Sequence, residues 1–211
     1  MRYILNVDER IRTSDEALNK QLWKLPVMIP FHGTFSEEAG AKFREQLEAA
    51  EDAALKIGQK IIPITIDSYG GSVYALLGMI DAIEQCSIPV ATIVESKAMS
   101  CGAILFSCGA AGHRYIGPNA TVMIHTVASG DFGKVDELKS STAESDRLNE
   151  KVFGLLAKNC GHKDNYFIDQ LKERKMADWF LTPQDCITHK LATKIHIPTI
   201  KVDVKYDFTI D

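Results

Sequence analysis

The sequence has little of what marks several large classes of protein. Its five cysteines are odd in number and irregularly spaced, so they lack the pattern of a disulfide framework. No apolar run approaches the ~18 residues of a membrane span, and the charged beginning MRYILNVDER is unlike a secretory signal. Basic residues are not in excess, with 24 Lys and Arg against 28 Asp and Glu, which disfavours a general nucleic-acid binder. We expect a cytoplasmic protein that binds neither membranes nor nucleic acid.

What is present is the composition of an ordinary globular chain. The 211 residues are 45% hydrophobic and 25% charged, and they contain no repeat and no low-complexity stretch. Apolar strand-like runs alternate with helical patterns, which is typical of an α/β domain built from crossover units. The length fits one domain with additions at its ends.

The patterns predict where the main elements lie. Strands are expected at residues 27–33, 60–67, 88–94, 114–117, 121–126 and 201–208, and residues 3–7 are a candidate partner for the last of these. Helices are expected from Ser36, after Gly71, over 101–111, over 134–159 and from Thr182. The helix over 134–159 is long and polar.

Two junctions between a strand and the following helix could carry chemistry. Gly70 and Gly71 follow one predicted strand, and Ser100 precedes the helix that follows the next. Consecutive parallel strands end at the same edge of a sheet, where α/β proteins bind their ligands. A serine hydroxyl near the N–H groups of Gly71 and Cys101 could attack a carbonyl and stabilise the oxyanion. Taken alone, these residues are more typical of a turn and a helix cap.

A serine nucleophile needs a base, and His125 follows the apolar strand that begins at Thr121. A histidine at the end of a strand is by itself more often structural. A third group must orient the imidazole, and Asp178 is one candidate among 28 acidic residues. Spacing cannot select it, because members of a catalytic triad are neighbours in space and not in sequence.

Three motifs in order resemble the proteolytic subunit of the Clp protease, ClpP. They are DSYGGSV at 67–73, SKAMSCGA at 96–103, and a segment that begins RY at 114 and ends MIH at 125. The family shows a serine-proline-glycine-glycine turn, an alanine-serine-methionine-glycine segment and a methionine-isoleucine-histidine strand. The intervals between the glycines, the serine and the histidine also match, and the resemblance runs from about Val27 to Ile195.

The resemblance implies a role for each of five residues. Ser100 would be the nucleophile, His125 the general base, and the N–H groups of Gly71 and Cys101 the oxyanion donors. Asp178 would be the orienting acid, since the family's aspartate also stands before a Phe-Leu-Ser/Thr stretch. No metal or organic cofactor is implied.

The resemblance also implies an α/β fold of the ClpP/crotonase type, with stacked β-β-α crossover units and a protruding handle helix at about 134–159. The peptidase domain would cover 27–197, between a divergent N-terminal segment, 1–26, and a C-terminal strand extension, 198–211. The implied function is a serine endopeptidase that hydrolyses peptides and unfolded polypeptides. The implied assembly is a homo-oligomer, a heptameric ring that in the family stacks into a double ring around a chamber.

Several positions depart from the family. Tyr69 replaces the turn proline, Thr126 and Val127 replace a glutamine-proline pair, and Cys101 replaces a methionine. Residues 1–26 do not resemble the segment with which the family engages an AAA+ unfoldase, which puts that partner in question more than the chemistry.

Two other functions remain open. One is a non-proteolytic ring or scaffold subunit, which usually lacks a member of the triad. The other is a specialised protease, such as the ClpP-like proteases of bacteriophage heads, that works without an ATPase. A crotonase-type acyl-CoA enzyme would share the fold type but would not require the serine, histidine and aspartate.

Overall fold

The computed structural model describes residues 2–6, 26–128 and 132–203. The strands are β1 (Arg2–Asn6), β2 (Ile29–Phe35), β3 (Ile62–Gly71), β4 (Val90–Met99), β5 (Arg114–Ile116), β6 (Thr121–Ile124), β7 (Trp179–Leu181), β8 (Lys194–Ile195) and β9 (Thr199–Asp203). The helices are α2 (Glu37–Ile57), α3 (Val73–Gln85), α4 (Cys101–Ser107), α5 (Val135–Asn159), α6 (Tyr166–Glu173) and α7 (Pro183–Thr188).

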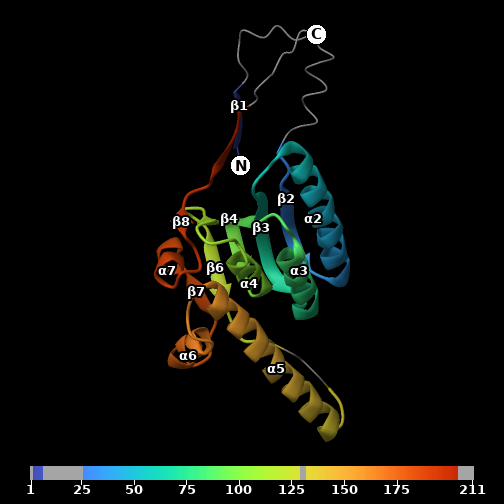
Figure 1. The fold of residues 1–211 in the computed structure, drawn as a ribbon. Coiled ribbons are helices and arrows are strands. Elements are labelled where there is room, and N and C mark those ends of the chain that lie inside the picture. The colour runs from blue at the N-terminus through green and yellow to red at the C-terminus, as the bar shows by residue number, and fades with distance from the viewer. Residues whose placement is uncertain (1, 7–25, 129–131, 204–211) are drawn as a thin grey trace, which may run out of the picture.

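A parallel sheet in the order β2-β3-β4-β5-β8 forms the centre of the molecule (Figure 1). Helices α2, α3 and α4 follow strands β2, β3 and β4 in turn, so that each strand returns parallel to the one before it. Parallel neighbours require such crossover connections. The predicted α/β fold built from crossover units is confirmed.

Strand β4 has a different neighbour along each half of its length. Its residues 92–94 pair with β5, whereas its residues 97–99 pair with β6. Strand β7 then adds to β6 in the antiparallel direction. The sheet therefore branches where β4 ends, and a second small layer of strands begins there.

Local sequence explains how the first helix begins and ends. The Ser36 side chain accepts a hydrogen bond from the N–H of Ala39, and Glu37 and Glu38 occupy the first turn, as the pattern predicts. Gly58 adopts the left-handed conformation with φ 72° and ends the helix. The buried face of α2 includes Phe43 and packs into the core beside α3.

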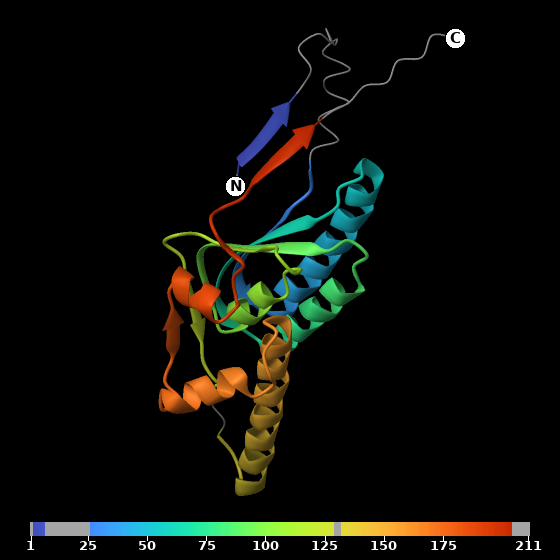
Figure 2. The ribbon, with the colours of Figure 1, turned by 60° about the vertical axis from the view of Figure 1, so that its left-hand side comes forward.

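The long helix α5 projects from the body of the molecule (Figures 1 and 2). Its bounds, Val135–Asn159, agree with the expected 134–159. All of its buried residues lie in its second half, at Leu148, Val152, Phe153, Leu156 and Ala157. The first half therefore extends beyond the core to which the second half is anchored.

Several elements have bounds that differ from the sequence prediction. Strand β2 covers 29–35 and not 27–33, and β6 ends at Ile124 and not at 126. Strands β3 and β4 continue to Gly71 and Met99, well past the expected ends at 67 and 94, because both keep pairing partners beyond those points. Helix α4 ends at Ser107 and not at 111. A Cβ at Gly109 would lie 2.3 Å from Thr92 Oγ1, so the chain turns closely over β4 there.

The two ends of the described chain pair with each other. Strands β1 and β9 are parallel, with Arg2 opposite Thr199 and Asn6 opposite Asp203, and they extend away from the main sheet (Figure 2). The predicted pairing is confirmed for residues 3–6, although the tail strand begins at Thr199; residues 7 and 204–208 lie outside the described residues. Within the described ranges, no helix is long and apolar enough to cross a membrane.

Candidate active site

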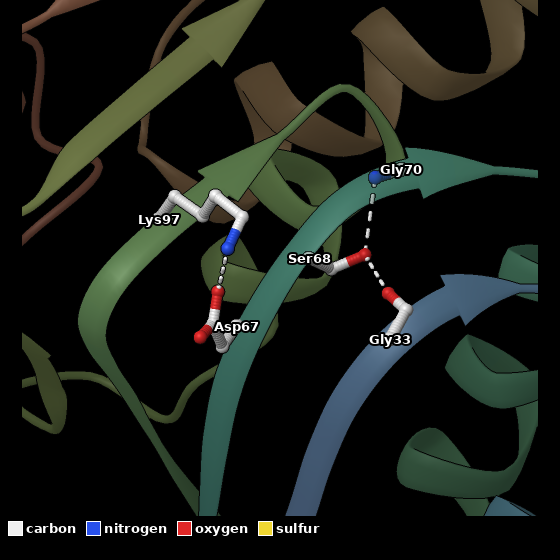
Figure 3. Close-up of polar contacts among 5 residues, drawn as sticks. All are labelled: Gly33, Asp67, Ser68, Gly70 and Lys97. Atoms are coloured by element: carbon white, nitrogen blue, oxygen red, sulfur yellow. Dashed lines mark hydrogen bonds and ion pairs between the residues drawn. The ribbon is translucent and has the colours of Figure 1, made fainter.

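The last residues of β3 are held by backbone and side-chain contacts. Ser68 Oγ donates to the carbonyl of Gly33 at 2.5 Å and accepts from the N–H of Gly70 at 3.0 Å (Figure 3). Gly71 has φ 144°, and a Cβ there would lie 2.4 Å from the carbonyl oxygen of Phe35. A side chain at position 71 is therefore excluded by both conformation and space.

Ser100 occupies a strained turn between β4 and α4. Its φ of 54° is unusual for a residue with a side chain, and such strain is concentrated at functional sites. Its N–H donates to the carbonyl of Met123 at 2.8 Å. A Cβ at Gly70 would lie 2.7 Å from the Cβ of Ser100, so the glycine makes room for the serine. The Ser100 side chain makes no capping hydrogen bond with α4, which argues against the simple helix-cap interpretation.

His125 lies directly after β6 and reaches the serine. Its Nε2 is 2.8 Å from Ser100 Oγ, within hydrogen-bonding distance. Met99 of β4 pairs with Met123 of β6 in a parallel ladder. Ser100 and His125 come one and two residues after this pair, so the pairing brings them to the same end of the two strands. The structure therefore brings together the two residues that the sequence analysis paired as nucleophile and base.

Asp178 approaches His125 from β7. In the antiparallel ladder Ile124 pairs with Trp179, so one step further along the same register Asp178 comes opposite His125. The distance from Asp178 Oδ1 to His125 Nδ1 is 3.8 Å, which is longer than a hydrogen bond. The Asp178 side chain is 56% exposed, against 28% for His125. Asp178 is therefore near the imidazole but is not bonded to it in this structure.

A pocket of about 270 Å³ opens beside Ser100 and His125. Its other lining residues are mostly apolar and come from α3, α4, β6 and the chain after it, and α5, as well as the β3 turn: Tyr69, Gly71, Val73, Leu76, Cys101, Ile104, Met123, Ile124, Val127, Ala128 and Val152. Such a pocket suits an apolar side chain next to a group that reacts with Ser100.

The side chain of Cys101 contributes a contact that the sequence analysis did not anticipate. The residue is 3% exposed, and its Sγ donates to the carbonyl of Gly71 at 3.2 Å. Burial raises the pKa of the Cys101 thiol, so it stays protonated and acts as a donor near neutral pH. The thiol thus ties the glycine turn to the first residue of α4. The motif alone pointed only to the backbone N–H of Cys101.

A charged pair steadies an aromatic residue at the rim of the pocket. Lys97 Nζ forms an ion pair with Asp67 (Figure 3) and lies 4.4 Å from the centre of the Tyr69 ring. This hydrogen bond to Asp67 raises the pKa of Lys97. Tyr69 itself is 73% exposed, so a cation–π contact orients a ring that the core does not hold. The sequence showed that Tyr69 replaces a proline but gave no sign of its partners.

The remaining chemistry of the described chain is simple. All five cysteines are free, as expected. No group of three or more His, Cys, Asp or Glu side chains in residues 2–6, 26–128 and 132–203 is arranged to hold a metal ion.

Comparison with known proteins identifies the family. The family model described as Clp protease matches residues 27–198. The chain is also 32% identical over 141 residues to the ATP-dependent Clp protease proteolytic subunit 1 of Rhodopirellula baltica. That alignment covers 67% of this chain and 60% of the relative. Because the family model spans most of the sequence, including both strand-to-helix junctions, the chain belongs to the Clp protease family.

Proposed function

We propose that this protein is a serine endopeptidase in which Ser100, His125 and Asp178 act as the catalytic triad. The observation that carries the proposal is the 2.8 Å approach of His125 Nε2 to Ser100 Oγ at the edge of an apolar pocket. A serine hydroxyl bonded to an imidazole is the arrangement that activates serine as a nucleophile. Membership of the Clp protease family supports the same chemistry.

In the first half of the reaction, Ser100 Oγ attacks the carbonyl carbon of the peptide bond. His125 Nε2 takes the hydroxyl proton as the new C–O bond forms. The carbonyl oxygen becomes an oxyanion, and the N–H groups of Gly71 and Cys101 would donate to it. The N–H of Cys101 is suited to this role because first-turn N–H groups have no acceptor within their own helix. His125 then returns the proton to the leaving amine, which leaves an acyl-enzyme.

In the second half, water replaces the amine. His125 takes a proton from the water, the resulting hydroxide attacks the acyl carbon, and Ser100 leaves with the proton restored. Asp178 would stabilise the imidazolium that forms in both halves. Its 3.8 Å separation from His125 would have to shorten during the reaction, as catalytic hydrogen bonds often do when substrate binds.

We further propose that residues 27–197 form the peptidase domain and that it works as a ring-shaped homo-oligomer, with 1–26 and 198–211 as additions. Helix α5 supports this because its first half lies outside the core of its own chain. Enclosure in a chamber would restrict substrates to peptides and unfolded segments. The family implies an AAA+ unfoldase as partner. Residues 1–26 do not resemble the family's segment for that partner, so the proposal rests less on the unfoldase than on the ring.

A non-proteolytic scaffold is the alternative, and the geometry favours catalysis. A scaffold has no need for a serine held at φ 54° with its hydroxyl directed to a histidine instead of its own helix.

The test compares the wild-type protein with Ser100→Ala on fluorogenic peptides and with a fluorophosphonate that labels active serines. Wild type should cleave and label, while Ser100→Ala should fail to label and lose about 10⁶-fold in kcat, as in other serine proteases. Equal turnover by the two proteins, or a wild type that does not label, would rule out the proposed function.

A further inference from the structure

The segment that follows His125 forms part of the pocket but lies outside any strand. Strand β6 ends at Ile124, and residues 125–128 have no regular secondary structure. Val127 and Ala128 line the pocket beside Ser100. Their position must therefore be set by something other than a β-ladder.

Asn149 of α5 supplies a contact to this segment. The N–H of Val127 donates to Asn149 Oδ1 at 2.7 Å, and both residues are half-buried. A partly buried N–H without a strand partner needs an acceptor, because leaving it unpaired is costly.

The same helix connects this hydrogen bond to the pocket. Val152, nearly one turn beyond Asn149, lines the pocket and is 5% exposed. The preceding residue, Thr126, lines a second cavity of about 460 Å³ together with Asn149. Residues 126–128 thus border two cavities, and the bond from Val127 to Asn149 holds the segment against α5.

We propose that Asn149 is a positioning residue that fixes the Val127–Ala128 wall of the substrate pocket and so determines how tightly peptides bind. This inference rests on the proposed peptidase function. Asn149 acts through the backbone of Val127 and does not line the pocket that holds Ser100. Its loss should therefore raise KM for peptides and leave the reactivity of Ser100 intact.

The experiment measures kcat and KM on a fluorogenic peptide with a large apolar residue before the cleaved bond, alongside the rate of fluorophosphonate labelling. Asn149→Ala should lower kcat/KM about five- to thirtyfold, mostly through KM, the range expected from one lost hydrogen bond with a partly buried donor. Labelling should change by less than about twofold, because the small reagent does not need the wall. Asn149→Asp keeps an acceptor oxygen and should restore most of the loss.

Two further variants separate positioning from a general loss of structure. Asn165→Ala is the matched control, since Asn165 lines the same second cavity but bonds to Asp169 of its own helix region and not to the Val127 segment, and it should leave kcat/KM unchanged. A Val127→Pro variant has no N–H at position 127 to donate to Asn149. Adding Asn149→Ala to it should therefore have no further effect on KM, whatever Val127→Pro does alone.

The outcomes are distinguishable from failure of the proposed function. If wild type neither cleaves nor labels, the peptidase assignment fails. If wild type is active but Asn149→Ala has wild-type kinetics, or Asn149→Asp and Asn149→Ala lose equally, the inference about Asn149 is wrong. An equal loss from Asn149→Ala in the wild-type and Val127→Pro backgrounds would also overturn it.

Discussion

The two halves of the candidate site are built in different ways. The half that contains Gly71 and Ser100 lies at the ends of two adjacent parallel strands and is fixed by close backbone contacts. The half that contains His125 and Asp178 lies on short strands at the branch of the sheet, with a 3.8 Å gap and an aspartate that is 56% exposed.

The difference indicates which half is ready before substrate binds. Groups that stabilise an oxyanion act best when they need no reorganisation, and close contacts provide that. Asp178, the proposed orienting acid, lies 3.8 Å from His125 and is 56% exposed, so its side chain has room to move closer. We therefore expect the nucleophile half to be preorganised and the base half to tighten on substrate binding.

Among variants that keep the nucleophile, the largest effect should come from Gly71→Ala. The added Cβ would meet Phe35 O at 2.4 Å, so the turn must shift and the Gly71 N–H must move from its position. We expect kcat to fall about 10²–10³-fold, the loss typical of one oxyanion donor, in peptide assays.

Gly33→Ala is the matched control for this change. Gly33 has φ 142°, close to that of Gly71, but a Cβ there would have nothing within 4 Å. It should lower the melting temperature through backbone strain alone and retain most of kcat. Comparable losses of kcat in the two variants would show that backbone conformation at the glycine, and not close packing at position 71, determines the geometry of the half that contains Gly71 and Ser100.

Asp178→Ala should have a smaller effect. Because Asp178 is exposed and not yet bonded to His125, we expect a fall in kcat of about 10²-fold, short of the roughly 10⁴-fold seen where such an aspartate is buried and bonded. Single-turnover acylation at several pH values would measure it. A loss of about 10⁴-fold would mean that Asp178 is as preorganised as a buried, bonded aspartate and that the two halves do not differ in this way.

The smallest expected effect is on the pH dependence of stability, through His189, which packs against β7. His189 packs edge-on against Trp179, 4.7 Å between ring centres, and its Nδ1 lies 2.7 Å from the hydroxyl of Tyr166. Burial, with repulsion from Arg174, lowers the pKa of His189 below its ordinary 6.5. The unfolded chain therefore binds more protons, so this stability is present above pH 6.5 and is lost as pH falls through the folded-state pKa.

Thermal melts between pH 7 and pH 5 would measure this effect. The melting temperature should fall on acidification in wild type and fall less in His189→Gln, which cannot take up the proton. Parallel pH dependence in the two proteins would show that His189 does not couple β7 to pH.

Much of the fold could be predicted because its signals are local, whereas the five candidate site residues were named from the resemblance of three motifs. Ser36 begins a helix where its capping pattern predicts, and the long helix ends at Asn159, as expected. The predicted strands end too early, at 67 and 94. Strands β3 and β4 continue to Gly71 and Met99 because pairing with neighbouring strands extends both beyond their apolar runs. The partners of Tyr69 and Val127 could not be predicted, since Lys97 lies on β4 and Asn149 lies on α5.

The sequence by itself determined the parallel α/β order and the turns that carry Gly71 and Ser100, because successive crossover units place them at one edge of the sheet. Their approach to His125 was expected from the motifs, and the structure places the two side chains 2.8 Å apart; their catalytic roles stay predictions. Spacing alone could not select the acid that faces His125, and Asp178 was expected only from the resemblance; the β6–β7 register is what brings it opposite the imidazole. Only the tertiary structure decided which acceptor holds Val127, because that contact depends on the packing of α5, for which local patterns carry no information.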